Sequence, residues 1–156
     1  MNRALRLVSA TTLSACALLA SAAPPDPPAA TVRVERPWAR ATPPGATIGA
    51  GYLELRNMGD TADRLVRATS PRAAAVQIHV TLMADGMMQM RQVDGLDLAP
   101  GGSVRLEPGG THLMLVDLAQ PLVAGERVPL VLHFARGGRL TAELVVAPPG
   151  SPGPAP

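Results

Sequence analysis

The chain has 156 residues and a formal net charge of +2, a length that allows one domain with a core of ordinary size. Two arginines, Arg3 and Arg6, lie in a predicted export signal over residues 1–22, so its removal leaves twelve arginines and twelve acidic residues. A nearly neutral mature protein offers no basic stripe, which excludes nucleic acid as a partner. Glycine and proline are abundant and aromatic residues are rare, a composition that favours short strands joined by turns.

The N-terminus is typical of an exported bacterial protein. A basic segment over residues 1–6 precedes an apolar segment over residues 7–19, and small residues at 20–22 fit a signal-peptide cleavage site. Residues 13–16 end in Cys16 and also resemble a lipobox, where the signal would be residues 1–15 and the cysteine would be acylated. Both alternatives remain open. In either case the mature protein carries no free thiol, and it meets a membrane only if Cys16 is lipidated.

The remaining residues divide into a spacer, a domain and a tail. Residues 23–33 form a proline-rich spacer, residues 34–147 form the domain, and the low-complexity tail over residues 148–156 is expected to be disordered. Short apolar or alternating runs predict strands at residues 32–35, 51–56, 63–69, 75–82, 87–93, 104–106, 112–117, 128–134 and 140–146. Asp85-Gly86 predicts a hairpin turn. No amphipathic helix is apparent, so the expected fold class is all-β, a Greek-key sandwich or barrel.

Four residues in the middle of the chain are candidate metal ligands. His79 is followed after ten residues by Met90, and twenty-one residues later come His112 and Met114. The run from His112 to Val116 alternates, which places His112 and Met114 on one face of a strand. His79 lies on the less apolar face of the strand over residues 75–82. Imidazole and thioether ligands without a carboxylate favour a soft metal, above all Cu(I).

Each of these residues alone has a simpler interpretation. A methionine on a strand usually fills the core, which is the interpretation for Met58, while core and site roles for Met83 and Met88 remain open. His133 is interpreted as a hydrogen-bonded or surface residue. Three histidines and no cysteine in the domain leave little for a nucleophile–base pair or a metal-activated water, so no enzyme is predicted. The alternative function is a metal-independent exported β-sandwich that serves interaction or assembly.

Taken together, the four candidate ligands resemble the signature of the periplasmic copper-chaperone family PCuAC: His, ten residues, Met, twenty-one residues, His-x-Met. The resemblance covers roughly residues 34–147 and includes residues 38–40, 51–52, 57, 63–65, 86–91, 100–102 and 108–114. It implies a cupredoxin-like β-sandwich that binds one Cu(I) through His79, Met90, His112 and Met114. It further implies delivery to the copper centre of cytochrome c oxidase in the periplasm, directly or through a Sco-type thiol protein.

Two further expectations follow, the first from the resemblance and the second from the positions of the four residues on their strands. Some relatives carry a His- and Met-rich C-terminal extension associated with a second, Cu(II) site, but the tail of this chain has no such ligand, so a single copper site is expected. The four ligands should meet at one edge of the sandwich, within reach of a partner. Those of Met83, Met87 and Met88 that are not in the core would form an apolar surface around the metal.

Overall fold

The computed structural model describes residues 31–153, and all their regular secondary structure is β-strand. Every expected strand is present, and most extend one to three residues beyond the expected ends. One short strand, Leu96–Leu98, was not expected. In chain order the strands are β1 (Val32–Arg40), β2 (Ile48–Asn57), β3 (Asp63–Thr69), β4 (Ala73–Ala84), β5 (Met87–Val93), β6 (Leu96–Leu98), β7 (Ser103–Leu106), β8 (His112–Leu118), β9 (Arg127–Phe134) and β10 (Arg139–Ala147).

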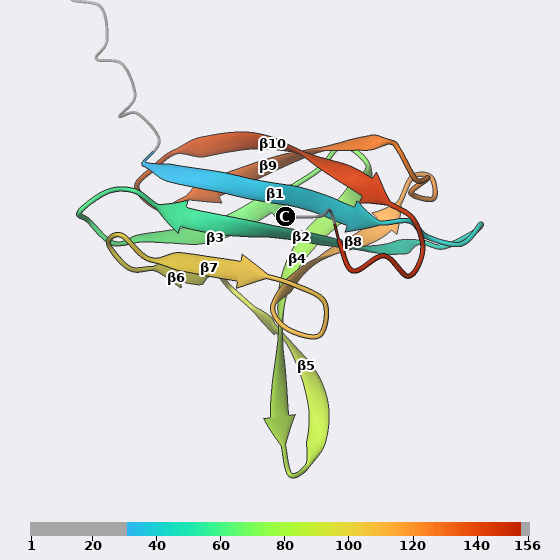
Figure 1. The fold of residues 1–156 in the computed structure, drawn as a ribbon, viewed down its shortest axis with the longest axis horizontal. Coiled ribbons are helices and arrows are strands. Elements are labelled where there is room, and N and C mark those ends of the chain that lie inside the picture. The colour runs from blue at the N-terminus through green and yellow to red at the C-terminus, as the bar shows by residue number, and fades with distance from the viewer. Residues whose placement is uncertain (1–30, 154–156) are drawn as a thin grey trace, which may run out of the picture.

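Seven of these strands form a closed barrel, in the order β4-β8-β2-β1-β10-β9-β3, and the pair Ala68↔Val76 returns β3 to β4. Among the pairings of the described strands, only β1–β10 is parallel. Strands β5, β6 and β7 lie outside this ring and pair with β4, β3 and β2, as Figure 1 shows. The interior is filled mainly by leucines with less than 2 % of their surface exposed: Leu55, Leu65, Leu98, Leu113, Leu115, Leu122, Leu130, Leu132 and Leu144. The all-β prediction is confirmed.

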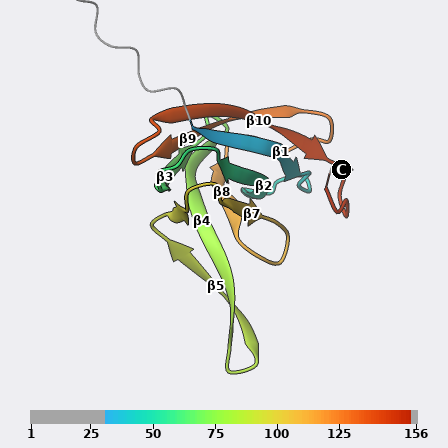
Figure 2. The same cartoon turned by 60° about the vertical axis from the view of Figure 1, so that its left-hand side comes forward.

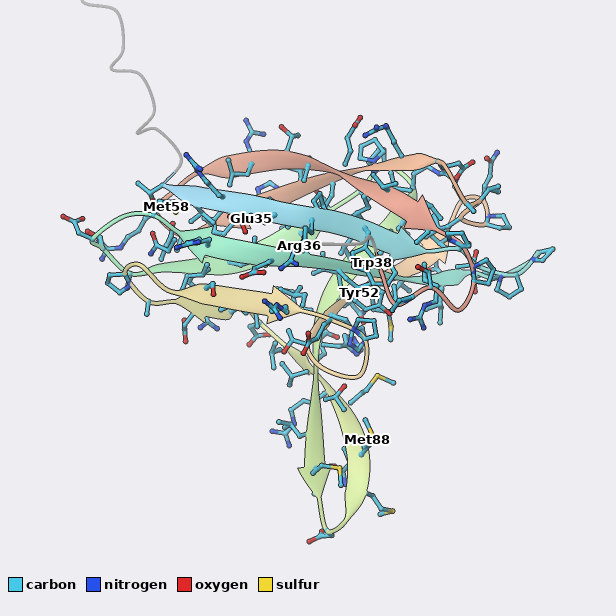
Figure 3. The ribbon with its side chains drawn as sticks, in the orientation of Figure 1. Glu35, Arg36, Trp38, Tyr52, Met58 and Met88 are labelled. Carbon is cyan, nitrogen blue, oxygen red and sulfur yellow. The ribbon has the colours of Figure 1, made fainter. Side chains whose placement is uncertain are left out.

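An irregularity in β1 positions the aromatic residues of the barrel. The register of β1 against β2 shifts between Glu35 and Trp38, where Pro37 cannot donate a ladder hydrogen bond. Trp38 is buried and packs on Tyr52, with ring centroids 4.4 Å apart; Figure 3 shows the two side by side. Trp38 is therefore a packing anchor.

The hairpin of β4 and β5 projects from the barrel (Figures 1 and 2). Its turn has the expected conformation, because Asp85 and Gly86 have φ values of 51° and 76° and Ala84 pairs with Met87. The reason for the projection lies in β8, which pairs with β4 only as far as His79↔His112. Beyond that pair β4 has β5 as its neighbour and loses contact with the barrel core.

The projection changes the burial expected for several side chains. Five residues of the hairpin are between 48 % and 70 % exposed: Leu82, Met83, Met87, Met88 and Met90. Of the two roles considered for Met83 and Met88, the core role is therefore excluded. The core role predicted for Met58 is also wrong, since this residue is 52 % exposed; it lies just after β2, outside the leucine-filled interior.

Both ends of the chain extend beyond the described residues. The expected signal peptide, Cys16 and most of the spacer lie outside them, as do residues 154–156. In the tail, Arg40 Nη2 donates a hydrogen bond to the Ser151 carbonyl at 3.5 Å. The Gly153 backbone approaches the Trp38 ring so closely that a Cβ there would lie 3.0 Å from it. Disorder of residues 148–156 stays a prediction. Within residues 31–153 there is no helix long and apolar enough to cross a membrane.

Candidate metal centre

The two candidate histidine ligands lie directly opposite each other. His79 on β4 and His112 on β8 are partners in an antiparallel ladder, and such partners project from the same face of a sheet. Their ring centroids are 5.7 Å apart, with planes inclined by 44°. The core-facing neighbours Ile78 and Leu113 form the preceding register pair and are buried. Alternation therefore turns both imidazoles outward, close enough together to share an ion.

The two candidate methionines flank this pair on the same face. Met114 lies two residues beyond His112 on β8 and pairs with Gln77, the residue two before His79. Met90 on β5 pairs with Thr81, the residue two after His79. Since β4 residues two apart share a face, His79, Met90, His112 and Met114 all belong to the outer face of one three-stranded surface.

A cavity of about 250 Å³ lies over part of this surface. Met90, His112 and Met114 line it together with Tyr52 and Arg40. His79 is not among the lining residues. The structure thus brings three of the four candidates to one cavity and places the fourth, His79, directly across the ladder from His112.

Hydrogen bonds leave one nitrogen of each imidazole free. His112 Nδ1 lies 3.0 Å from the Gly110 carbonyl oxygen, which can only accept, so Nδ1 carries the hydrogen and Nε2 keeps its lone pair. His79 Nε2 lies 2.9 Å from Gln77 Oε1 and donates to it in the same way. His79 Nδ1 is buried and has no hydrogen-bond partner among the described residues.

An unpaired buried nitrogen is unfavourable, because it has lost water without gaining a partner. A metal ion bound at His79 Nδ1 would remove that cost. The partners of the other two nitrogens, Gln77 and Gly110, would orient the rings in the way that outer-shell groups orient metal-binding histidines. The polar groups of this surface therefore fit a soft metal ion held by nitrogen and sulfur.

The charge around the cavity also fits such an ion. Arg40 is the one charged residue among the described residues that line it. Its guanidinium carbon lies 5.9 Å from the centroid of the Tyr52 ring. Burial raises the pKa of Tyr52, and the nearby Arg40 charge opposes this effect in part, so the phenol stays neutral. Hard cations prefer carboxylate oxygens, whereas the donors here are neutral imidazole and thioether groups.

The histidine pair predicts a pH dependence of the copper-free protein. Desolvation, and second the neighbouring His112, lower the pKa of His79 below its usual value. The unfolded chain, with a histidine pKa of about 6.5, then binds more protons than the folded one as pH falls, so the free energy of unfolding should decrease from about pH 7.5 to about pH 5.5. Urea denaturation at both pH values should show a larger decrease for the wild type than for His79→Gln. Equal decreases would mean that His79 does not titrate as described.

Nearly the whole described barrel matches one protein family. Residues 32–146 match the family described as "Putative lipoprotein LpqE-like". The chain belongs to this family. It is the PCuAC family, so the predicted resemblance is confirmed.

Relatives of known sequence and structure extend this assignment. The Leifsonia xyli subsp. xyli protein named "Putative lipoprotein Lxx21020" is 35 % identical over 147 residues, which cover 88 % of this chain and 87 % of the relative. The copper-bound PCuAC domain from PmoF2 is 29 % identical, with a TM-score of 0.66 over 76 % of this chain and 94 % of that domain. The CuI form of DR1885 from Deinococcus radiodurans is 30 % identical, with a TM-score of 0.59 over 77 % of this chain and 78 % of that one. The cupredoxin-like fold expected from the resemblance is thereby confirmed.

Sequence reasoning did not identify the residues that support the candidate ligands. Gln77 could have been found, because it lies two residues before His79 and must share its face. The Gly110 carbonyl could not, since its position depends on the turn before β8. Arg40 and Tyr52 reach the cavity from β1 and β2, far away in sequence, and only the barrel closure brings them there.

Proposed function

We propose that this protein is a copper chaperone that holds one Cu(I) through His79, Met90, His112 and Met114. The observation that carries the proposal is the His79–His112 pair, whose free nitrogens lie on one sheet face with two thioethers beside them. In this proposal His79 binds through Nδ1 and His112 through Nε2. The copper-bound PmoF2 domain and the CuI form of DR1885, both similar to this chain, support the choice of metal.

Cu(I) rather than Cu(II) follows from the donor set. Thioether ligands prefer the reduced, softer ion. Four neutral ligands leave the whole ionic charge in place, and the Arg40 guanidinium at the same cavity disfavours a second positive charge. A methionine site also cannot be closed by a disulfide in an oxidising compartment, although thioethers can be oxidised to sulfoxide. The site is therefore suited to holding copper reversibly in the periplasm.

The proposed recipient is the copper centre of cytochrome c oxidase, reached directly or through a Sco-type thiol protein. A thiolate binds Cu(I) more strongly than a thioether because it contributes a negative charge as well as a soft donor. Copper should therefore pass from this site to a cysteine-containing one without an energy source. The proposed role requires no catalysed reaction, in agreement with the prediction that the protein is not an enzyme.

The proposed site is accessible to a partner protein, as a copper donor requires. Met90 is exposed on the projecting hairpin, and the cavity that it shares with His112 and Met114 opens beside that hairpin. A partner could reach the metal without unfolding the barrel.

Attachment of Cys16 to a lipid would hold the protein at the membrane that carries the oxidase, whereas cleavage after Ala22 would release it. The mass of the exported protein distinguishes these two alternatives.

One experiment separates this proposal from a metal-independent interaction domain. In a strain that lacks the gene, the copper content of purified cytochrome c oxidase should fall. A wild-type copy should restore it, and a copy with His79→Ala and His112→Ala should not. Restoration by the variant would show that the protein assists the oxidase without carrying copper, and an unchanged copper content in the deletion strain would exclude delivery.

A further inference from the structure

Folding does not explain the composition of the projecting hairpin. Four of the chain's seven methionines lie between Met83 and Met90, and each is more than 60 % exposed. Burying such a side chain would stabilise the fold by about 1.5–3 kcal/mol, yet these four contribute nothing to the core. A two-residue turn between strands also has no need for methionine, since β-branched and aromatic residues form strands more readily. Exposed apolar side chains gathered in one place usually have a function.

Three of the four methionines share the face of the candidate metal centre. Met88 pairs with Met83 across the hairpin, and Met90 pairs with Thr81. Both pairs belong to the face that carries His79. Met87, which pairs with Ala84, points to the opposite face. We call Met83, Met88 and Met90 the methionine face; Figure 3 labels Met88 on the hairpin.

The spacing along this face is regular. Starting from the barrel, the register gives His79↔His112, then Thr81↔Met90, then Met83↔Met88 next to the tip. Residues two apart on one strand are separated by about 6.5 Å, and the Cβ atoms of directly paired residues lie about 5 Å apart. A methionine side chain is long and has three rotatable bonds. The Met90 sulfur can therefore reach toward the histidines in one rotamer and toward Met88 in another.

The chemistry of the methionine face suits a monovalent soft ion. Its three thioethers are neutral, and the other hairpin side chains on that face are Thr81 and Gln92. Arg91 pairs with Val80 and so points to the opposite face. Three thioethers without imidazole should bind Cu(I) more weakly than the four-ligand centre. The methionine face would therefore not draw copper away from the four-ligand centre at equilibrium.

We propose that Met83, Met88 and Met90 form a second, transient Cu(I) site through which copper leaves the His79–His112 centre toward an acceptor at the hairpin tip. This proposal rests on the proposed function of the centre. Met90 is the shared ligand: its bond to copper persists while the bonds to His79, His112 and Met114 break and bonds to Met88 and Met83 form. Copper remains Cu(I) throughout and passes from four neutral ligands to three, so the transfer needs no oxidant or reductant. Copper thus moves about two register steps while at least one sulfur ligand stays bound to it.

The first test uses Ag(I), a redox-inert ion with the same preference for thioethers, and follows the methionine methyl groups by NMR. The first equivalent should shift the signals of Met90 and Met114. Because the first ion already engages Met90, further equivalents should shift the signals of Met83 and Met88 progressively, as expected for weak and rapid binding to two thioethers, and should leave Met87 and Met58 unchanged. Unchanged Met83 and Met88 signals, or an equal response of Met87, would overturn the second site.

The second test measures the rate of Cu(I) transfer to a peptide with two cysteines, read from the ultraviolet absorbance of the copper–thiolate bond. The variant Met83→Leu with Met88→Leu should keep the wild-type equilibrium affinity and transfer copper on the order of tenfold more slowly, because the tethered intermediate ligands are lost. Met87→Leu is the matched control, equally exposed on the same hairpin, and should transfer at the wild-type rate. Wild-type rates in the double variant would overturn the proposal.

These outcomes are distinguishable from failure of the proposed function. If the four-ligand centre is wrong, the wild type will not bind a first equivalent of Cu(I) tightly. The proposed function then fails before any hairpin variant is compared. If only the hand-off is wrong, the wild type will bind one equivalent tightly and the double variant will release it at the wild-type rate.

Discussion

Replacement of both His79 and His112 by alanine should reduce the Cu(I) affinity by well over about 100-fold, since even outer-shell changes at metal sites cost about 10–100-fold. The variant loses both free nitrogens and keeps only two thioethers. Neither imidazole belongs to the leucine-filled interior, so the barrel should remain folded. The measurement is competition with a coloured Cu(I) chelator, combined with far-ultraviolet circular dichroism to verify the fold.

His133 supplies the matched control. It lies on β9, where its Nε2 is 3.5 Å from Thr69 Oγ1, and it pairs with Arg67 and Arg139 rather than with any candidate ligand. His133→Gln should bind Cu(I) with wild-type affinity. Loss of affinity in this variant, or a change of less than about threefold in the double variant, would remove the histidine pair from the site.

Two neighbouring residues on β8 should give opposite results. Leu113 is fully buried and packs in the barrel, so Leu113→Ala should reduce the free energy of unfolding by about 2–5 kcal/mol. Met114 projects from the other face, so Met114→Leu should cost less than about 1.5 kcal/mol, because the volume is nearly conserved. Its Cu(I) affinity should nevertheless fall by about 10-fold or more, since one of four ligands is lost.

Urea denaturation and chelator competition on both variants test this contrast. The folded fraction of Leu113→Ala should bind copper as the wild type does, because its ligands are intact. If Met114→Leu binds as tightly as the wild type, the second sulfur ligand is another residue, and Met88 would be the first alternative on that face.

The alternation along single strands made the faces of the candidate site predictable. Apolar Leu113 and Leu115 bracket Met114 and follow His112, so the outward direction of the two candidates follows from the local sequence. Asp85-Gly86 likewise specified a two-residue hairpin, which keeps Met90 in register with Thr81. These features depend on local backbone geometry alone.

The pairing of distant strands was not predictable. The local sequence of residues 73–84 and 112–118 does not predict that His79 pairs with His112, because this register depends on how the strands of the whole barrel are arranged. The β4–β8 pairing stops at His112, where β8 begins. The part of the β4–β5 hairpin beyond this pair therefore does not pack against the barrel core. That is why Met83 and Met88 are exposed, although a methionine on a strand usually packs inside. The family signature predicted the ligand set; the barrel geometry places its members on one face.

X-ray absorption at the copper edge, on protein loaded with one equivalent of Cu(I), tests the central claim most directly. The proposed site predicts an edge typical of Cu(I) and a first shell of two nitrogen and two sulfur neighbours, with one sulfur fewer in Met90→Leu and in Met114→Leu. A first shell without sulfur, or one that both variants leave unchanged, would contradict the assignment of copper to His79, Met90, His112 and Met114.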